Sequence, residues 1–116
     1  MNSSWNNVIE KKDAKKDVEK AILVGIILPN QSEALIKEHL DELEFLALTA
    51  GAKVIKRFVQ KLNGPHSSTY IGKGKVEEIV EYMEHFPADM VIFDDDLSGK
   101  QQNILEEALK VKIIDR

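Results

Sequence analysis

One uninterrupted apolar run constrains the fold of this chain more than any other feature. Residues 21–28 read AILVGIIL, eight apolar residues in succession. A run of that length is typical of a strand that is buried on both faces, as in a parallel sheet with helices on either side. It is far too short for a membrane-spanning helix, which needs about 20 residues. We therefore expect this segment to be the central strand of a layered domain.

The rest of the chain alternates between helical and extended patterns. Apolar residues recur at steps of 4, 3, 4 and 3 from Ile36 to Ala50, which predicts a helix that ends at Gly51. Its first turn has two candidate caps, Asn30 and Ser32, and Asn30 has capping-box spacing with a following glutamate. Two further helices are expected after residues 74 and 98, and three further strands over 54–60, 90–93 and 111–114.

The order of these elements predicts an α/β fold. Short connections and right-handed crossovers give a mostly parallel four-stranded sheet with helices on both faces, half of a doubly wound fold. The sequence does not determine the order of the strands, for which 2-1-3-4 is the natural guess. The second strand carries more charge than the others, so we expect it near an edge of the sheet.

Composition limits the chain to one domain and excludes several kinds of chemistry. With 116 residues it is one ordinary domain, which we place at residues 20–116 after a polar tail, partly helical or disordered, at residues 1–19. The chain has no cysteine, so it has no disulfide, no zinc knuckle and no thiol catalysis. We expect no secretory signal, and we expect a soluble cytoplasmic protein that does not bind membranes. The oligomeric state stays open.

Charge is distributed unevenly along the chain. Residues 53–75 contain six bases and no acid, and residues 76–99 contain eight acids and no base. The net charge of −4 excludes a generally basic nucleic-acid binder, but this basic block with its His66 and Tyr70 suits a phosphate backbone, RNA especially. The alternative is that its lysines only protect an edge strand from pairing.

Gly72-Lys73-Gly74-Lys75 is the sharpest local motif. Its glycines allow a ligand to approach the backbone, and the helix that follows offers free N–H groups, so a phosphate site is one interpretation. A plain glycine turn is the other. Because the chain lacks the earlier glycine and the hydroxyl residue of a P-loop, a nucleotide P-loop is excluded.

Three aspartates, Asp94 to Asp96, follow the expected third strand. Carboxylates in that place hold Mg²⁺ in receiver domains, but such a domain also needs acids after its first strand, where Leu28-Pro29-Asn30 stands. The alternative is that they favour the positive end of the following helix. The three histidines lack metal-ligand spacing, and no serine has an evident base, so we assign no metal and no catalytic residue.

Several motifs together resemble the amino-terminal domain of HflX-type GTPases over roughly residues 20–116. They are AILVG at 21–25, LEFLALTAG at 43–51, VQK at 59–61, TYIGKGKVE at 69–77, VIFDD at 91–95 and IIDR at 113–116. The resemblance implies a protein in which a helical connector and a Ras-like GTP-binding domain follow this one. GTP and Mg²⁺ belong to that absent domain, so no cofactor and no GTP hydrolysis are expected of these 116 residues. Gly99 departs from the family, which usually has proline there.

The resemblance also implies a partner. Such proteins associate with the large ribosomal subunit, where they are implicated in splitting or rescuing ribosomes or in assembly, so we expect ribosomal RNA, and not DNA, as the ligand. The candidate contacts are Lys61, Lys73 and Lys75 within the matching motifs, then Lys56, Arg57, His66 and Tyr70, with Gly72 and Gly74 shaping the turn. The alternative function is a regulatory domain that binds a nucleotide or another phosphate ligand at Gly72–Lys75.

Overall fold

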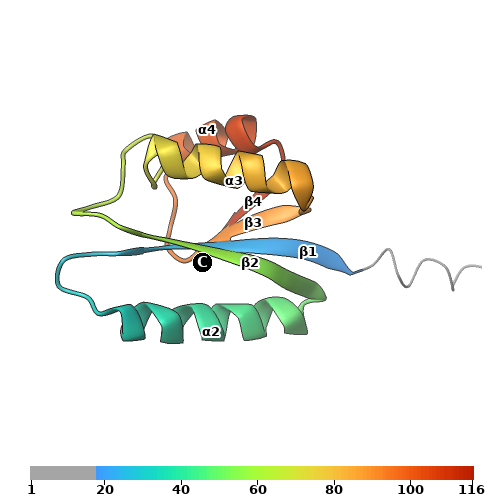
Figure 1. Ribbon diagram of the computed structural model, residues 1–116, viewed down its shortest axis with the longest axis horizontal. Helices are drawn as coiled ribbons and strands as arrows, with labels where there is room; N and C mark the ends of the chain where they lie inside the picture. The colour runs from blue at the N-terminus through green and yellow to red at the C-terminus, as the bar shows by residue number, and fades with distance from the viewer. Residues whose placement is uncertain (1–17) are drawn as a thin grey trace, which may run out of the picture.

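A four-stranded parallel sheet forms the centre of the structure, a computed structural model that describes residues 18–116 (Figure 1). The strands are β1 (Glu19–Ile27), β2 (Ala52–Lys61), β3 (Met90–Phe93) and β4 (Lys112–Asp115). Their order is β2-β1-β3-β4, and every neighbouring pair is parallel. The predicted strand order and the edge position of the second strand are confirmed. Most of the polar tail predicted at residues 1–19 lies outside the described residues.

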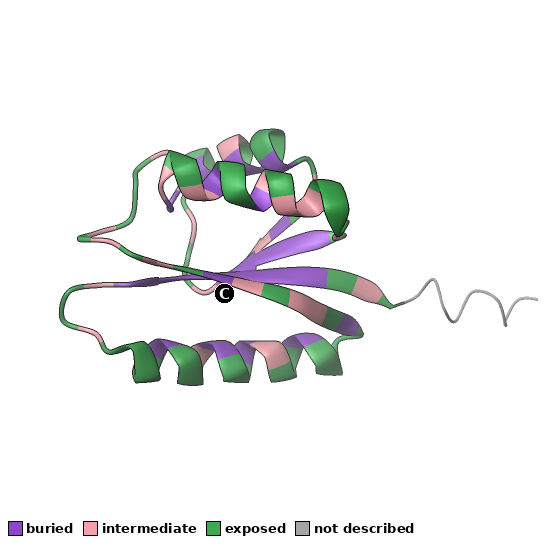
Figure 2. Cartoon of the chain, viewed as in Figure 1, coloured by how far each residue is buried: buried purple, intermediate pink, exposed green. Residues whose placement is uncertain are grey.

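Helices cover both faces of the sheet, as the sequence predicts. Helix α2 (Glu33–Thr49) lies on one face, while α3 (Lys73–His85) and α4 (Gly99–Leu109) lie together on the other (Figure 1). Each helix connects two parallel strands and buries the side that faces the sheet (Figure 2). Within residues 18–116, none of these helices has the length and apolar character needed to cross a membrane.

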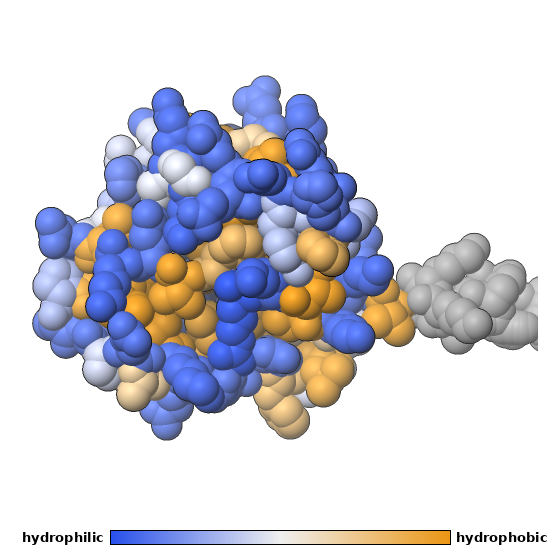
Figure 3. All heavy atoms as spheres, viewed as in Figure 1, coloured by the Kyte–Doolittle hydropathy of each residue, from blue (hydrophilic) through white to orange (hydrophobic). Residues whose placement is uncertain are grey.

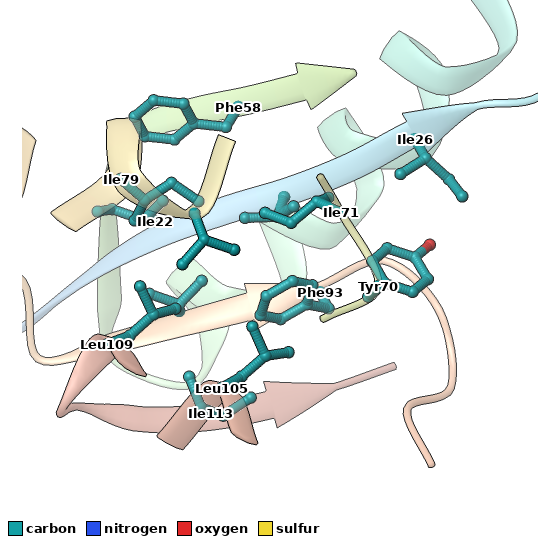
Figure 4. Close-up of a cluster of buried hydrophobic side chains, with 13 residues drawn as sticks. Ile22, Ile26, Phe58, Tyr70, Ile71, Ile79, Phe93, Leu105, Leu109 and Ile113 are labelled. Carbon is teal, nitrogen blue, oxygen red and sulfur yellow. The ribbon is translucent and has the colours of Figure 1, made fainter. Parts of the chain in front are cut away.

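The core consists of two apolar layers that share β1. Ile22, Val24 and Ile26 point into the layer beneath α3 and α4, which Figure 4 shows in close-up. Leu23 and Ile27 point into the layer beneath α2. Because successive side chains of a strand point to opposite faces, a strand between two helical layers has no position left for a polar residue. This explains the continuous apolar run in the sequence.

Both helix starts use a cap that the sequence predicts, and at α2 the structure selects one of two candidates. Ser98 and Gln101 form the predicted capping box of α4, with hydrogen bonds of 3.1 and 2.8 Å. At α2 the cap is Ser32, whose Oγ accepts a hydrogen bond from the Leu35 amide at 3.1 Å. The alternative cap, Asn30, is wrong because the chain makes one more turn before the helix begins. In this turn the Leu28 amide donates a hydrogen bond to Oε1 of Gln31.

Two glycines provide a matched test of this packing. A Cβ atom added to Gly25 in β1 would lie 3.5 Å from Leu40 Cδ2, an ordinary contact, so Gly25→Ala should raise the free energy of unfolding by about 0.4–1 kcal/mol. Gly51, after α2, has φ +93°, so Gly51→Ala should lower it by about 1–2 kcal/mol. Urea denaturation followed by circular dichroism measures both values. A loss of stability in Gly25→Ala would contradict the ordinary contact that the added Cβ atom makes with Leu40.

Candidate nucleic-acid interface

The predicted contact residues Lys61, His66 and Lys73 come together at one edge of the sheet. We call this the carboxyl edge, where β1, β2, β3 and β4 end at Ile27, Lys61, Phe93 and Asp115. Lys61 ends β2, His66 lies in the loop after it, and Lys73 opens α3. Ligands of open α/β sheets bind at this edge. The three side chains are exposed there.

The start of α3 leaves two backbone N–H groups free. Gly72 is the N-cap, and its carbonyl accepts hydrogen bonds from the amides of Lys75 and Val76 at 3.0 Å. Within residues 18–116, the amides of Lys73 and Gly74 have no acceptor. These groups lie at the positive end of the helix, where anions are stabilised. The phosphate-binding interpretation of this turn therefore has a geometric basis.

Gly72 and Gly74 differ in how much space surrounds them. The Gly72 amide donates to Oε1 of Gln60 in β2 at 2.9 Å. A Cβ atom on Gly72 would lie 3.2 Å from Nε2 of the same side chain, which is tighter than ordinary contact. A Cβ atom on Gly74 would meet nothing within 4 Å, so that glycine leaves open space above the helix start. Gln60 thus fixes the position of the turn.

The basic block does not form one continuous face. Arg57 faces α2, where its Nη2 lies 2.7 Å from an Asp41 oxygen and 2.8 Å from a Glu44 oxygen. Hydrogen bonds from Lys37 and Arg57 hold the pKa of Asp41 below its usual value. Lys56 lies on the opposite face, with its Nζ 5.6 Å from the ring centre of Tyr82. Apolar surface is visible between the two helical layers, where β2 forms the sheet edge (Figure 3).

The three lysines nearest the carboxyl edge differ in how freely they could meet a ligand. Lys61 pairs with Glu33 at 3.2 Å, but both side chains are 73% exposed, and such surface pairs contribute little. Lys75 is 20% exposed and pairs with Glu78 at 3.2 Å along its own helix. Lys73 has no ion-pair partner among the described residues. Of these three predicted contact lysines, Lys73 therefore has the fewest competing interactions among the described residues.

Tyr70 is a correction to the sequence analysis. It has a positive φ of 66° and is 2% exposed, with its ring edge-to-face against Phe93 at 5.6 Å (Figure 4). Its hydroxyl donates to Asp95 Oδ2 at 3.2 Å. The ring is not free to stack on a base, because the loop folds back and inserts it into the core. Burial and the nearby Asp95 charge raise the pKa of Tyr70 above its usual value.

Two glutamines that the sequence analysis did not single out as site residues position this loop. Gln60 holds Gly72, and the Nε2 of Gln101 donates to the His66 carbonyl at 2.7 Å. Gln101 is buried, although it lies in the first turn of α4. In the sequence, Gln101 is marked only by its capping-box spacing from Ser98. That it also reaches 35 positions back along the chain is a property of the folded molecule.

Two of the three aspartates after β3, Asp94 and Asp95, are occupied by structural contacts. Asp94, with a side chain 6% exposed, forms an ion pair with Arg116, and His39 Nδ1 lies 4.0 Å away. Asp95 accepts from the Tyr70 hydroxyl and from the Asp96 amide. The side chains that form the N-cap hydrogen bonds of α4 are Ser98 and Gln101, and stabilisation of the positive end of that helix by the aspartates stays a prediction. Within residues 18–116, no group of three His, Cys, Asp or Glu side chains is placed to hold a metal.

The Tyr70 contact predicts how stability changes at high pH. Removing the hydroxyl in Tyr70→Phe should lower the free energy of unfolding by about 1 kcal/mol at neutral pH, because a hydrogen bond to Asp95 is lost. The folded pKa is raised, so above about pH 10 the unfolded chain loses its tyrosine proton first and the native protein loses stability. The gap between the wild type and Tyr70→Phe should therefore shrink above about pH 10. Urea denaturation across this range measures it, and a constant gap would contradict the buried contact.

Comparison with known proteins shows which family the domain resembles. Residues 37–116 match the family model described as GTP-binding GTPase N-terminal. The chain is 48% identical over 98 residues to a GTPase HflX from Flavobacterium psychrophilum, covering 84% of this chain and 24% of the relative. It is 48% identical over 105 residues to a GTPase HflX from Caldanaerobacter subterraneus subsp. tengcongensis, covering 90% and 24%. With a GTPase HflX from Escherichia coli, the identity is 33% over 98 residues, covering 84% and 22%.

The chain spans about a quarter of the length of these curated relatives. Their shared name agrees with the resemblance that the motifs at 69–77 and 91–95 indicate. The family model covers more than half of the chain, including β2, β3, β4 and the start of α3. The protein therefore belongs to the GTP-binding GTPase N-terminal family, and its resemblance to HflX-type GTPases is confirmed.

Proposed function

We propose that this domain is an RNA-docking module that contacts the large ribosomal subunit through a basic corner at the carboxyl edge. The basic corner consists of Lys61, His66, Lys73 and the free amides of Lys73 and Gly74. The observation that carries the proposal is the helix start itself. An exposed lysine without a competing acid among the described residues stands beside two backbone donors at the positive end of α3.

Phosphate chemistry suits this corner. Lysine ammonium groups and backbone N–H groups at a helix start are donors that proteins use on phosphate oxygens. Lys75 adds positive charge behind them, although Glu78 partly compensates it. Lys56 and Arg57 contribute to the electrostatic field but hold other partners, and Tyr70 contributes no stacking surface. Binding should therefore depend mainly on charge and depend little on base sequence.

Acidic residues at the other half of the carboxyl edge restrict the direction in which bound RNA can run. Asp95 and Asp96 follow β3, two strands away from the end of β2. Because a phosphate backbone is repelled by these carboxylates, RNA that meets the basic corner is expected to run along β2 and α3 and away from β3. A domain docked in one orientation holds whatever follows β4 in a fixed direction.

Catalysis belongs to the rest of the protein in this proposal. The relatives are named GTPases, and the matched region is about a quarter of each. We assign GTP hydrolysis, with the GTP and Mg²⁺ that it needs, to the remaining part. The cytoplasm is the compartment in which a ribosome-bound protein acts. In this division, the present domain supplies position on the ribosome and the GTP-binding domain supplies the chemistry.

A second function draws on the same free amides. Lys73 and Gly74 would then bind the phosphate of a nucleotide or another small ligand directly. Titration calorimetry of the chain with GTP and ATP separates the two proposals. Stoichiometric micromolar binding that Lys73→Glu abolishes would favour the small ligand, whereas the RNA-docking proposal expects no saturable heat.

Two charge reversals, one at the carboxyl edge and one at the opposite end of β2, test the docking. Lys73→Glu should weaken co-sedimentation with purified large ribosomal subunits and lower the salt slope by about one unit, because one phosphate contact is lost. The matched control is Lys53→Glu, which makes the same charge change at the opposite end of β2 on another exposed lysine. It should leave both the affinity and the slope near those of the wild type.

Three outcomes of the co-sedimentation experiment would contradict the proposal. Equal losses in Lys73→Glu and Lys53→Glu would show a response to net charge and no localised corner. Unchanged binding in Lys73→Glu would remove the helix start from the interface. If the wild-type chain fails to sediment with the subunits even at low salt, the domain does not dock on the ribosome by itself.

A further inference from the structure

Strand β2 has a free outer side. Among the described strands it is the outermost on one side of the sheet (Figure 1). The Leu62 amide donates to the Ile27 carbonyl of β1 at 3.1 Å, so the backbone of Leu62 faces the sheet. Because successive residues of a strand direct their N–H and C=O groups to alternate sides, those of Arg57, Val59 and Lys61 face outward. These are the groups with which an additional strand would pair.

A β-bulge limits this free side to the second half of β2. The register between the two strands shifts just before Ile22, which is level with Lys56, so Ile55 is an extra residue in β2. The Ile55 carbonyl accepts a hydrogen bond from the Tyr82 hydroxyl at 3.5 Å. From residue 56 to residue 61 the register is regular, and we call this segment the β2 edge.

An apolar hollow lies beside the β2 edge on the side of α2. It encloses about 390 Å³, and its apolar lining comes from β1, β2 and α2 through Ile27, Val59, Ile36 and Leu40. Val59 is 38% exposed, and apolar surface is visible between the helical layers at this edge (Figure 3). Opposed residues of neighbouring strands point to the same face, so an added strand would direct every second side chain toward the hollow.

The cations of β2 that border the hollow are paired within the fold. Arg57 pairs with Asp41 and Glu44 of α2 at 2.7 and 2.8 Å. At the end of the strand, Lys61 pairs with Glu33 at 3.2 Å. Since acids of α2 compensate these cations, an incoming side chain on this side meets apolar surface rather than unbalanced charge. This side of the β2 edge therefore favours apolar residues on an added strand.

The lysines on the other side of β2 are not paired in this way. Ala52 and Val54 pack toward α2, so Lys53 between them points toward α3. Lys56 also points toward α3, with its Nζ 5.6 Å from the ring centre of Tyr82. Neither lysine forms an ion pair with another residue in the range 18–116. Opposite charges on adjacent strands stabilise their pairing, so this side favours acidic residues on an added strand.

Charge disfavours a second copy of this chain as the added strand. Antiparallel pairing of two β2 edges about a two-fold axis at Val59 would bring all the outward groups into register. Arg57 of each copy would then lie opposite Lys61 of the other. Like charges in that position destabilise strand pairing. The basic residues thus protect the edge from self-pairing, and they leave it available to a strand of opposite charge.

We propose that the β2 edge binds an extended segment of another protein as a fifth strand of the sheet, and that this segment alternates apolar and acidic residues. Its backbone pairs with the outward groups of the β2 edge. Its apolar side chains lie in the hollow beside α2, and its acidic side chains lie on the side of Lys53 and Lys56. The interaction requires neither Lys73 nor the free amides of α3, so it is independent of RNA docking.

Fluorescence anisotropy with a labelled synthetic peptide tests this proposal. The peptide has about seven residues, alternates valine with glutamate, and spans about 23 Å when extended, which covers the β2 edge. It should bind the chain saturably. A peptide of the same composition, with its valines grouped before its glutamates, should bind about tenfold more weakly, because it cannot present one residue type to each side.

Two matched charge reversals locate the binding. Lys56→Glu should weaken the alternating peptide about fivefold, because an attraction across the strands becomes a repulsion. Lys100→Glu makes the same charge change at an exposed lysine in the first turn of α4 and should leave the affinity unchanged. Val59→Pro removes an outward amide and no hydrogen bond to β1, so the variant should fold, by circular dichroism, and lose the peptide.

Four outcomes would overturn the proposal. They are the absence of saturable binding, equal affinity for the alternating and grouped peptides, equal losses in Lys56→Glu and Lys100→Glu, and full affinity in folded Val59→Pro. A dimer of the chain alone that Val59→Pro abolishes, seen by sedimentation, would also overturn it, because the occupant would then be a second copy. These measurements contain no RNA, so their result is separate from that of the co-sedimentation with ribosomal subunits.

Discussion

The burial of β1 on both faces is the constraint on which the rest of the structure depends. Ile22 and Val24 belong to the layer under α3 and α4, and Leu23 belongs to the layer under α2. Because β1 pairs with β2 and with β3, it takes part in two of the three strand pairings of the sheet. A strand in that position must be apolar throughout, and its neighbours must bring helices to both sides. The carboxyl edge, with all its candidate contacts, is a consequence of that arrangement.

The candidate site is positioned by amide side chains and an aromatic anchor more than by charge. Gln60 holds the start of α3, Gln101 holds the His66 carbonyl, and Tyr70 ties the loop to Phe93 and Asp95. Each contact joins the loop after β2 to a different part of the fold. The loop is polar in composition, yet it is anchored at three points, and this places Lys73 at the edge with its amide free.

The basic block of residues 53–75 is continuous along the chain but not in space. The sequence indicates a block of six bases without an acid, and within the chain that is correct. In space, Arg57 meets acids from α2, 13 and 16 positions earlier, and Lys75 meets a glutamate one helical turn later. The two faces of β2 then separate Arg57 from Lys56. Periodicity within a strand predicts this separation, but the approach of α2 does not follow from any local pattern.

The sequence by itself determined the elements, their order and the family, because apolar periodicity, capping residues and the TYIGKGK motif are local properties of the chain. The sequence did not determine the strand order, although short crossovers leave few topologies and the natural guess, 2-1-3-4, agrees with the structure. Only the tertiary structure decided that Tyr70 packs inward and that Asp94 pairs with Arg116. These outcomes depend on which side chains from distant segments reach the same volume. That is set by how the layers pack, which no pattern along the chain records.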